Sequence, residues 1–219
     1  MTVYERTPET TPSRHPERAR YDADTVHSIL DEALIGHLAF VVDDVPQVLP
    51  TLFVRVDESI FLHFSTGAGP ARLAKRRWGI PVSFEATLVD GLVLARSTFN
   101  HSANYRSVVV HGKLSLVDDK ARKREVMRQL VEKIVPGRSE DARGPDDREL
   151  RQTAVMELPL ETVSAKVRTG DPKDDARDMK RECWAGVVPL LYGRGAPVPA
   201  ADLGAGITIP RYLGPQTPR

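Results

Sequence analysis

The sequence is poor in cysteine and in aromatic residues: Cys183 is its single cysteine, and aromatics make up 6% of its 219 residues. One cysteine cannot form an intramolecular disulfide, and it excludes a cysteine-rich zinc site. A large net charge is also lacking, because 31 basic residues stand against 30 acidic ones. Without a bulk electrostatic field, we expect neither nucleic acid nor a membrane as a partner.

Several common sequence signatures are missing as well. Residues 1–22 are polar and contain prolines, so they lack the apolar centre of a signal peptide, and no apolar run approaches the length of a membrane span. We therefore expect a cytoplasmic protein. The chain has no Gly-x-Gly-x-x-Gly, Walker or Gly-x-Ser-x-Gly motif, which argues against a dinucleotide fold, a P-loop enzyme and a serine hydrolase. Its six histidines are scattered, so no metal site is expected.

The pattern of the chain predicts three regions: a flexible arm over residues 1–20, a folded domain over 21–170 and an extended tail over 171–219. Apolar residues at helical spacing predict a helix that begins at Asp22 or Asp24 and ends at Gly36, and another over residues 120–135. The other segments are mostly short β-rich runs separated by turn residues, without strand–helix–strand alternation. This organisation predicts a mainly β protein, a small antiparallel barrel with flanking helices.

One segment, LHFSTGAGPARLAKRR over residues 62–77, joins an apolar strand to a basic helix through a glycine turn. The free N–H groups at a helix start attract anions. The hydroxyls of Ser65 and Thr66 and the charges of Arg72 and Lys75 could serve the same anion, which predicts a phosphate site. The alternative, an ordinary joint with solvated basic residues, stays open on spacing alone.

Two further features could contribute to a ligand site. Strand alternation places His63 and Ser65 on one face, although that face could equally be an exposed polar one. Trp184, in the segment WAGVVPL, could cover a flat ring or simply anchor the core. Cys183 has no catalytic partner in the sequence, and we expect it to be inert.

Six segments then point to a family: LPTLFVRVDESIFLHFSTG, ATLVDGLVLARSTF, HSANYRSVVVHGK, VPGR, SAKVRTGDP and WAGVVPL. They occur in this order between about residue 16 and about residue 200. In combination they resemble the pyridoxamine 5′-phosphate oxidase-like FMN-binding split barrels, in the flavin-nucleotide-binding branch that includes the nitroimidazole-resistance proteins.

This resemblance implies a six-stranded antiparallel split barrel with flanking helices that forms a homodimer and holds FMN at the subunit interface. The implied contacts are Pro50, Thr51 and Leu52 beside the isoalloxazine ring; His63, Phe64, Ser65 and Thr66 along the ring and ribityl chain; Arg72 and Lys75 at the phosphate; Asn104, Arg106 and Ser107 from either subunit; and Trp184 near the flavin. One departure is Gly69, which stands where relatives commonly carry a basic residue, so phosphate binding here would depend on Arg72 and Lys75.

The function implied by the resemblance is that of an FMN-dependent oxidoreductase acting on a small-molecule substrate. Reduced nicotinamide would be the electron donor, and His63 would be the proton donor or substrate contact, since imidazole titrates near neutrality. Two alternatives remain open: a flavin carrier or sensor without turnover, and a split barrel that uses deazaflavin or haem instead of FMN. Pyridoxamine phosphate oxidase activity itself is disfavoured, because the tail lacks the expected arginine pattern for the substrate phosphate.

Overall fold

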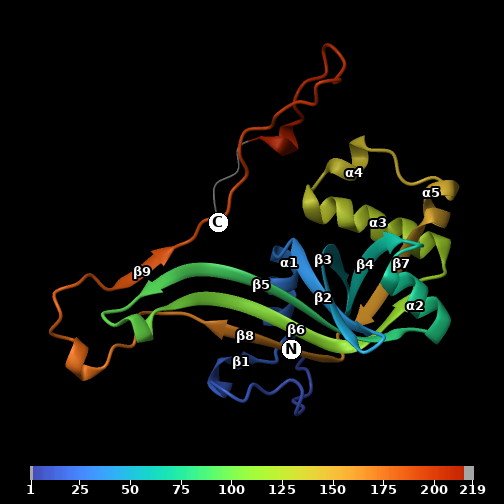
Figure 1. Cartoon of the computed structure of the whole chain (residues 1–219). Helices are drawn as coiled ribbons and strands as arrows, with labels where there is room; N and C mark the ends of the chain where they lie inside the picture. The colour runs from blue at the N-terminus through green and yellow to red at the C-terminus, as the bar shows by residue number, and fades with distance from the viewer. Residues whose placement is uncertain (1, 215–219) are drawn as a thin grey trace.

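The computed structural model describes residues 2–214, and a closed ring of six antiparallel strands forms its centre (Figure 1). Around the ring the order is β2 (Ile35–Val42), β3 (Val45–Val56), β4 (Ser59–Ser65), β7 (Thr153–Pro159), β6 (Ser102–Leu116) and β5 (Ile80–Leu94), and β5 pairs again with β2. The six-stranded antiparallel barrel expected from the sequence is therefore confirmed.

The interior of the ring is filled by alternate side chains of its strands, and α1 (Ala23–Glu32) adds Val26, Ile29 and Leu30 to the same core. Asp22 caps this helix by accepting a hydrogen bond from the Thr25 N–H at 2.8 Å. The helix ends at Glu32 rather than at Gly36, because β2 already begins at Ile35. Gly36 is needed there, since a Cβ at this position would lie 2.1 Å from the Phe84 ring.

The outer face of the barrel is covered in part by α3 (Lys120–Ile134). The helix predicted over residues 120–135 is therefore confirmed. Its buried side chains Val126 and Leu130 pack against Val54, Phe61 and Val155 of the barrel. Three shorter helices complete the body: α2 (Gly69–Arg77) between β4 and β5, and α4 (Arg138–Asp141) and α5 (Asp147–Gln152) between α3 and β7.

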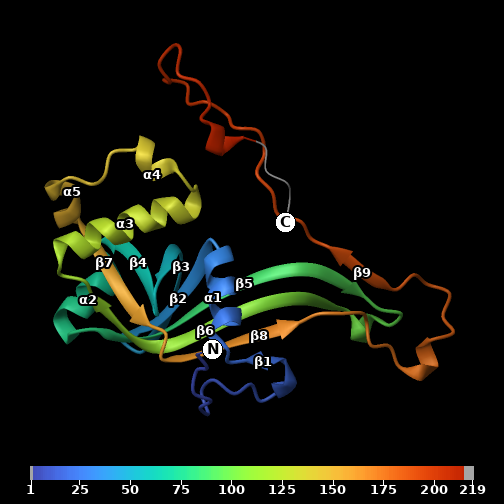
Figure 2. The same ribbon diagram turned by 180° about the vertical axis from the view of Figure 1, so that it is seen from behind.

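A long arm extends from the barrel, because β5 and β6 continue past the ring as a paired hairpin (Figures 1 and 2). β8 (Thr162–Arg168) pairs with β6, β9 (Gly186–Pro189) pairs with the outer end of β5, and the short β1 (Ala19–Arg20) pairs with β8. Gly91 permits this arrangement, since a Cβ there would lie 3.1 Å from the carbonyl oxygen of Val188 on β9. Single 3-10 turns occur at Pro16–Arg18, Thr98–Asn100, Ala176–Asp178 and Arg211–Leu213.

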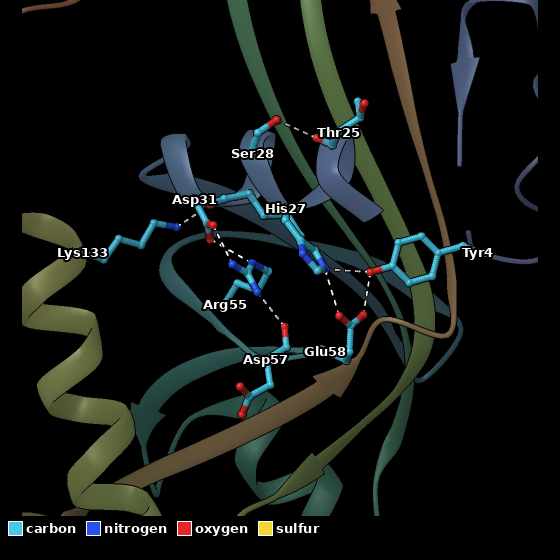
Figure 3. A network of polar contacts seen from close by, with 10 residues as sticks. Tyr4, Thr25, His27, Ser28, Asp31, Arg55, Asp57, Glu58 and Lys133 are labelled. Carbon is cyan, nitrogen blue, oxygen red and sulfur yellow. Dashed lines mark hydrogen bonds and ion pairs between the residues drawn. The ribbon is translucent and has the colours of Figure 1, made fainter. Parts of the chain in front are cut away.

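Both terminal regions are anchored to the body. Tyr4, in the segment expected to be a flexible arm, is 8% exposed, and its hydroxyl donates to Glu58 at 2.7 Å and contacts His27 Nε2 at 2.9 Å (Figure 3). In the tail, Arg194 donates to the carbonyl oxygen of Ile134 at 2.7 Å and the Tyr212 hydroxyl donates to Asp141. The boundaries at residues 20 and 170 stay predictions. No helix within residues 2–214 is long and apolar enough to cross a membrane.

Candidate functional site

The barrel is split between β3 and β4. These strands pair only between Phe53–Val56 and Ser59–Leu62, whereas β4 continues to Ser65 along β7 and residues 45–52 of β3 pair with β2. The edge of β4 over residues 63–65 therefore has no strand partner on its β3 side in the described part of the chain. Its N–H and C=O groups are available to a ligand. Pro50, Thr51 and Leu52 lie on β3 beyond the point of separation, on the opposite side of the split.

His63 lies on this free edge, on the outer face of the barrel as strand alternation predicts, while Leu62 and Phe64 belong to the interior core. Its Nδ1 is buried and has no hydrogen-bond partner among the described residues. Burial lowers the pKa of the imidazole below its ordinary value, so the ring is neutral at neutral pH. A neutral imidazole with an unused buried nitrogen is suited to a polar ligand atom.

The start of α2 continues the same edge. Ser65 and Thr66 are exposed; the Thr66 N–H donates to the Gln152 carbonyl oxygen at 3.0 Å, and the Ala68 N–H donates to that of Ser65 at 3.0 Å. No side chain caps the helix, and a Cβ at Gly69 would meet nothing within 4 Å, so the space in front of the first helical turn is open. The structure therefore keeps an uncapped helix N-terminus beside the split.

Arg72 and Lys75 are exposed on α2, and neither forms a salt bridge within residues 2–214. Their charges are thus available to an anion at the helix. The residues that the sequence predicts from Pro50 to Lys75 lie on three parts of the structure: β3 beyond the split, the free edge of β4, and α2.

Three other predicted residues are already engaged with the chain itself. Arg106 donates to both carboxylate oxygens of Asp90, at 3.0 and 2.7 Å, and to both of Glu32, at 2.6 and 3.0 Å. These two carboxylates raise the pKa of the guanidinium above its ordinary value. Asn104 is buried, donates to the Gly170 carbonyl oxygen at 3.2 Å and accepts from Arg168.

The third of these, Ser107, has its hydroxyl 3.4 Å from the Lys166 carbonyl oxygen, to which it donates. In this structure all three residues hold β6 to neighbouring elements. Their role toward a flavin remains a prediction, which would need these contacts to be shared or exchanged.

Trp184 lies at the far end of the arm, next to β9, and is 65% exposed. Its indole packs over Gly186, where an added Cβ would lie 2.9 Å from the ring. Both views place β9 and the arm tip away from β4 and α2 (Figures 1 and 2). One chain therefore does not bring Trp184 to the surface from Pro50 to Lys75.

The tip of the arm carries a histidine and several exposed apolar side chains. The Nδ1–H of His101 donates to the Ser97 carbonyl oxygen at 2.9 Å, since a carbonyl oxygen only accepts hydrogen bonds. In the neutral ring, Nε2 is then the nitrogen that carries the lone pair. Phe99 beside it is 88% exposed, and further exposed apolar side chains of the arm are Leu92, Met179 and Val188.

A cavity that the sequence did not indicate lies where α1, α3, the arm and residues 189–194 meet. Its volume is about 950 Å³, and its charged lining consists of Asp31, Glu32, Arg55, Asp90, Arg106, Glu132, Lys133 and Arg194. Lys133 is half-buried: its Nζ donates to the Leu30 carbonyl oxygen at 2.8 Å and lies 3.4 Å from the centre of the Phe53 ring. Burial lowers the pKa of Lys133 to about 7. Figure 3 shows its side chain near the ion pair of Arg55 and Asp31, whose closest atoms, Nη2 and Oδ2, are 2.6 Å apart.

Helical spacing could have revealed this lysine. Lys133 stands three residues after Leu130 and seven after Val126, on the apolar side of α3. Within residues 2–214 no group of three or more histidine, cysteine, aspartate or glutamate side chains is arranged to bind a metal ion.

Comparison with known proteins adds a family and close structural relatives. Residues 22–167 match the family model described as pyridoxamine 5′-phosphate oxidase. The flavocytochrome Anf3 from Azotobacter vinelandii is 35% identical, with a TM-score of 0.87 over 94% of this chain and 95% of that one. An FAD and heme binding protein from Mycobacterium smegmatis is 32% identical, with a TM-score of 0.83 over 90% of this chain and 95% of that one.

A third structure shares the fold alone. It is that of a candidate 5-nitroimidazole antibiotic resistance protein from Bacteroides thetaiotaomicron, 20% identical, with a TM-score of 0.56 over 68% of this chain and 86% of that one. A comparison with curated proteins gives no significant match.

Proposed function

The chain belongs to the pyridoxamine 5′-phosphate oxidase family, whose members bind flavins, and we propose that it is a flavin-dependent oxidoreductase. The observation that carries this proposal is the free edge of β4, where the buried, unpartnered Nδ1 of His63 lies next to the uncapped start of α2. A flavin presents a planar ring with polar atoms along one edge and a phosphate at the end of a flexible chain. The split and the helix start offer partners for both.

Different residues would bind different parts of the flavin. N–H and C=O groups of β4 bind the polar edge of the ring, Pro50, Thr51 and Leu52 pack beside it, and Arg72 and Lys75 bind the phosphate. The flavin supplies the electron or hydride transfer when bound, and the protein orients it and limits water. His63, neutral at neutral pH, keeps one ring N–H that can donate a hydrogen bond to a substrate at the flavin ring and one ring nitrogen that can accept a proton.

FMN is the flavin that the sequence resemblance implies, and one of the structures named above, the FAD and heme binding protein from Mycobacterium smegmatis, favours the larger FAD. Both proposals use the same surface, because FAD contains the FMN group. The residues from Pro50 to Lys75 would hold that shared half in either case.

A homodimer is the assembly that would complete the site. The outer ends of β5 and β6, where Asn104 lies, and β9, which adjoins Trp184, lie away from β4 and α2 within one chain (Figures 1 and 2), so a second copy would have to bring them to the β4 edge. The exposed apolar side chains Leu92, Phe99 and Val188 on the arm give such an assembly a surface to bury. Reduced nicotinamide is the electron donor that we propose.

Haem is a second cofactor favoured by a specific observation: of the structures named above, the two that exceed 30% identity are described as a flavocytochrome and as an FAD and heme binding protein. The arm tip fits such a group chemically. His101 offers a free Nε2 whose tautomer is fixed by the Ser97 carbonyl, as in histidine ligands of metals, and Phe99 and Trp184 offer apolar surface to a flat macrocycle. Under this proposal the protein binds both haem and a flavin, whereas the sequence analysis treats haem only as an alternative to FMN.

The absorbance spectrum of the purified protein tests these proposals. Flavin bands together with a Soret band are expected, and denaturation followed by chromatography identifies FMN or FAD. Anaerobic mixing with reduced nicotinamide should bleach the flavin bands, and an added acceptor should restore them. A protein that stays colourless and takes up neither flavin contradicts the proposed function. A flavin that binds but never bleaches would favour a carrier or sensor.

A further inference from the structure

The exposed side of α2 carries a strip of unneutralised positive charge. Arg72, Lys75, Arg76 and Arg77 are all exposed, and none of them takes part in a salt bridge or side-chain hydrogen bond within residues 2–214. Arg72, Lys75 and Arg76 are spaced to lie on one side of the helix. Four adjacent free cations exceed what the single phosphate of FMN requires.

Trp78 ends this strip in an unusual conformation. Its indole is 87% exposed, so it does not contribute to the core. Its backbone is left-handed, with φ 56° and ψ 41°, a conformation that glycine and asparagine adopt readily and that a bulky side chain disfavours. Neither packing nor local backbone geometry therefore explains a tryptophan here, and strained positions of this kind concentrate at functional sites.

A second cavity lies beside the chain segment that contains Trp78, although Trp78 itself does not line it. Its volume is about 640 Å³, within the range typical of ligand pockets, and it is bordered by Arg77 and Ile80, the residues that flank Trp78 and Gly79. Its other walls come from the β2–β3 hairpin and include Phe40, Val41 and Pro46. Asp43 and Asp44, at the hairpin turn, also border the cavity and suit ribose hydroxyl groups.

We propose that the exposed side of α2, Trp78 and this second cavity form the subsite for the adenosine diphosphate half of FAD. The inference rests on the proposed function, which places the FMN half at the start of the same helix. From Gly69 to Trp78 the helix rises about 13 Å, a distance that an extended dinucleotide spans. Arg72 and Lys75 then bind the first phosphate, Arg76 and Arg77 bind the second, and the adenine stacks on the indole.

The experiment compares FAD and FMN binding to the full-length protein stripped of flavin, by calorimetry or flavin fluorescence. Trp78→Asn is the test variant, because asparagine tolerates the left-handed backbone and folding is preserved. We expect it to weaken FAD binding by about 5- to 150-fold, the range that corresponds to losing one base–aromatic stack, and to change FMN binding by less than about twofold. Trp78→Phe should restore most of the FAD affinity. Tyr192→Asn, which removes another exposed aromatic, should alter neither.

Further measurements distinguish a failure of the proposed subsite from a failure of the proposed function. ADP alone should compete with FAD but not with FMN in the wild type. If Trp78→Asn leaves FAD affinity unchanged while both flavins bind the wild type, the subsite is wrong and the flavin proposal survives. If neither flavin binds the wild type, the proposed function and the subsite fail together. If Trp78→Asn instead weakens reduced nicotinamide binding to protein loaded with FMN, and FAD affinity is unchanged, the adenosine belongs to the electron donor and the assignment to FAD is overturned.

Discussion

Lys133 provides the sharpest test of the electrostatics, because it is a half-buried lysine whose pKa is lowered from 10.5 to about 7 by desolvation. Desolvation dominates this change; Asp31 opposes it, and Arg55 adds to it. For a base whose pKa is lower in the folded state, protonation favours unfolding. Below pH 7 the folded protein carries the full cost of the buried charge, and above pH 10.5 both states are neutral and the cost vanishes. The contribution of Lys133 to stability therefore rises with pH between these limits.

The size of this effect follows from the pKa change. A change of one in pKa corresponds to about 1.4 kcal/mol, so the difference between pH 6 and pH 10 is at most about 4 kcal/mol. Lys133 lines the 950 Å³ cavity, through which water screens the amine. We therefore expect roughly 2–4 kcal/mol.

The assay is urea unfolding of the wild type and of Lys133→Met at a series of pH values from 6 to 10. The gain in unfolding free energy on replacing lysine by methionine should be larger at pH 6 than at pH 10 by that amount. Loss of the hydrogen bond to Leu30 and of the contact with Phe53 also enters the comparison, and because both favour the ammonium form they reduce the slope without reversing it. Lys180→Met, at an exposed position, is the control and should show no such slope. A Lys133→Met difference that stays constant across the series would refute the reasoning.

The remaining predictions concern the cofactors. In a fluorescence titration, Arg72→Ala should weaken flavin binding by about 1–3 kcal/mol, the scale of one charged hydrogen bond. Arg177→Ala is the exposed control, and equal flavin affinities of Arg72→Ala and the wild type would remove Arg72 from the phosphate site. His63→Ala should retain flavin and change the rate of reoxidation by an acceptor, and an unchanged rate would exclude His63 from the reaction. His101→Ala should lose the Soret band and keep the flavin bands, whereas His15→Ala should keep both; a Soret band that survives His101→Ala would assign the axial ligand elsewhere.

The barrel could be predicted from the sequence because each ring strand contains either alternating apolar and polar residues or a short apolar run, and because α3 contains apolar residues at helical spacing. The β4–α2 surface could be predicted for the same reason, since its residues are contiguous in sequence. What escaped prediction depends on contacts between distant segments. Nothing near Tyr4 indicates that its hydroxyl reaches Glu58, and nothing near residue 90 indicates that β9 returns to pair there.

Arg106 shows how a residue can match a family motif while the structure assigns it other contacts. Its guanidinium joins Glu32 at the end of α1 to Asp90 at the bulge of β5, where the arm leaves the barrel. These bidentate pairs tie the base of the arm to the body. In the proposed homodimer, that tie would set the position from which Trp184 and His101 reach the partner. Arg106 would then serve the flavin site by positioning the arm, without touching the flavin itself.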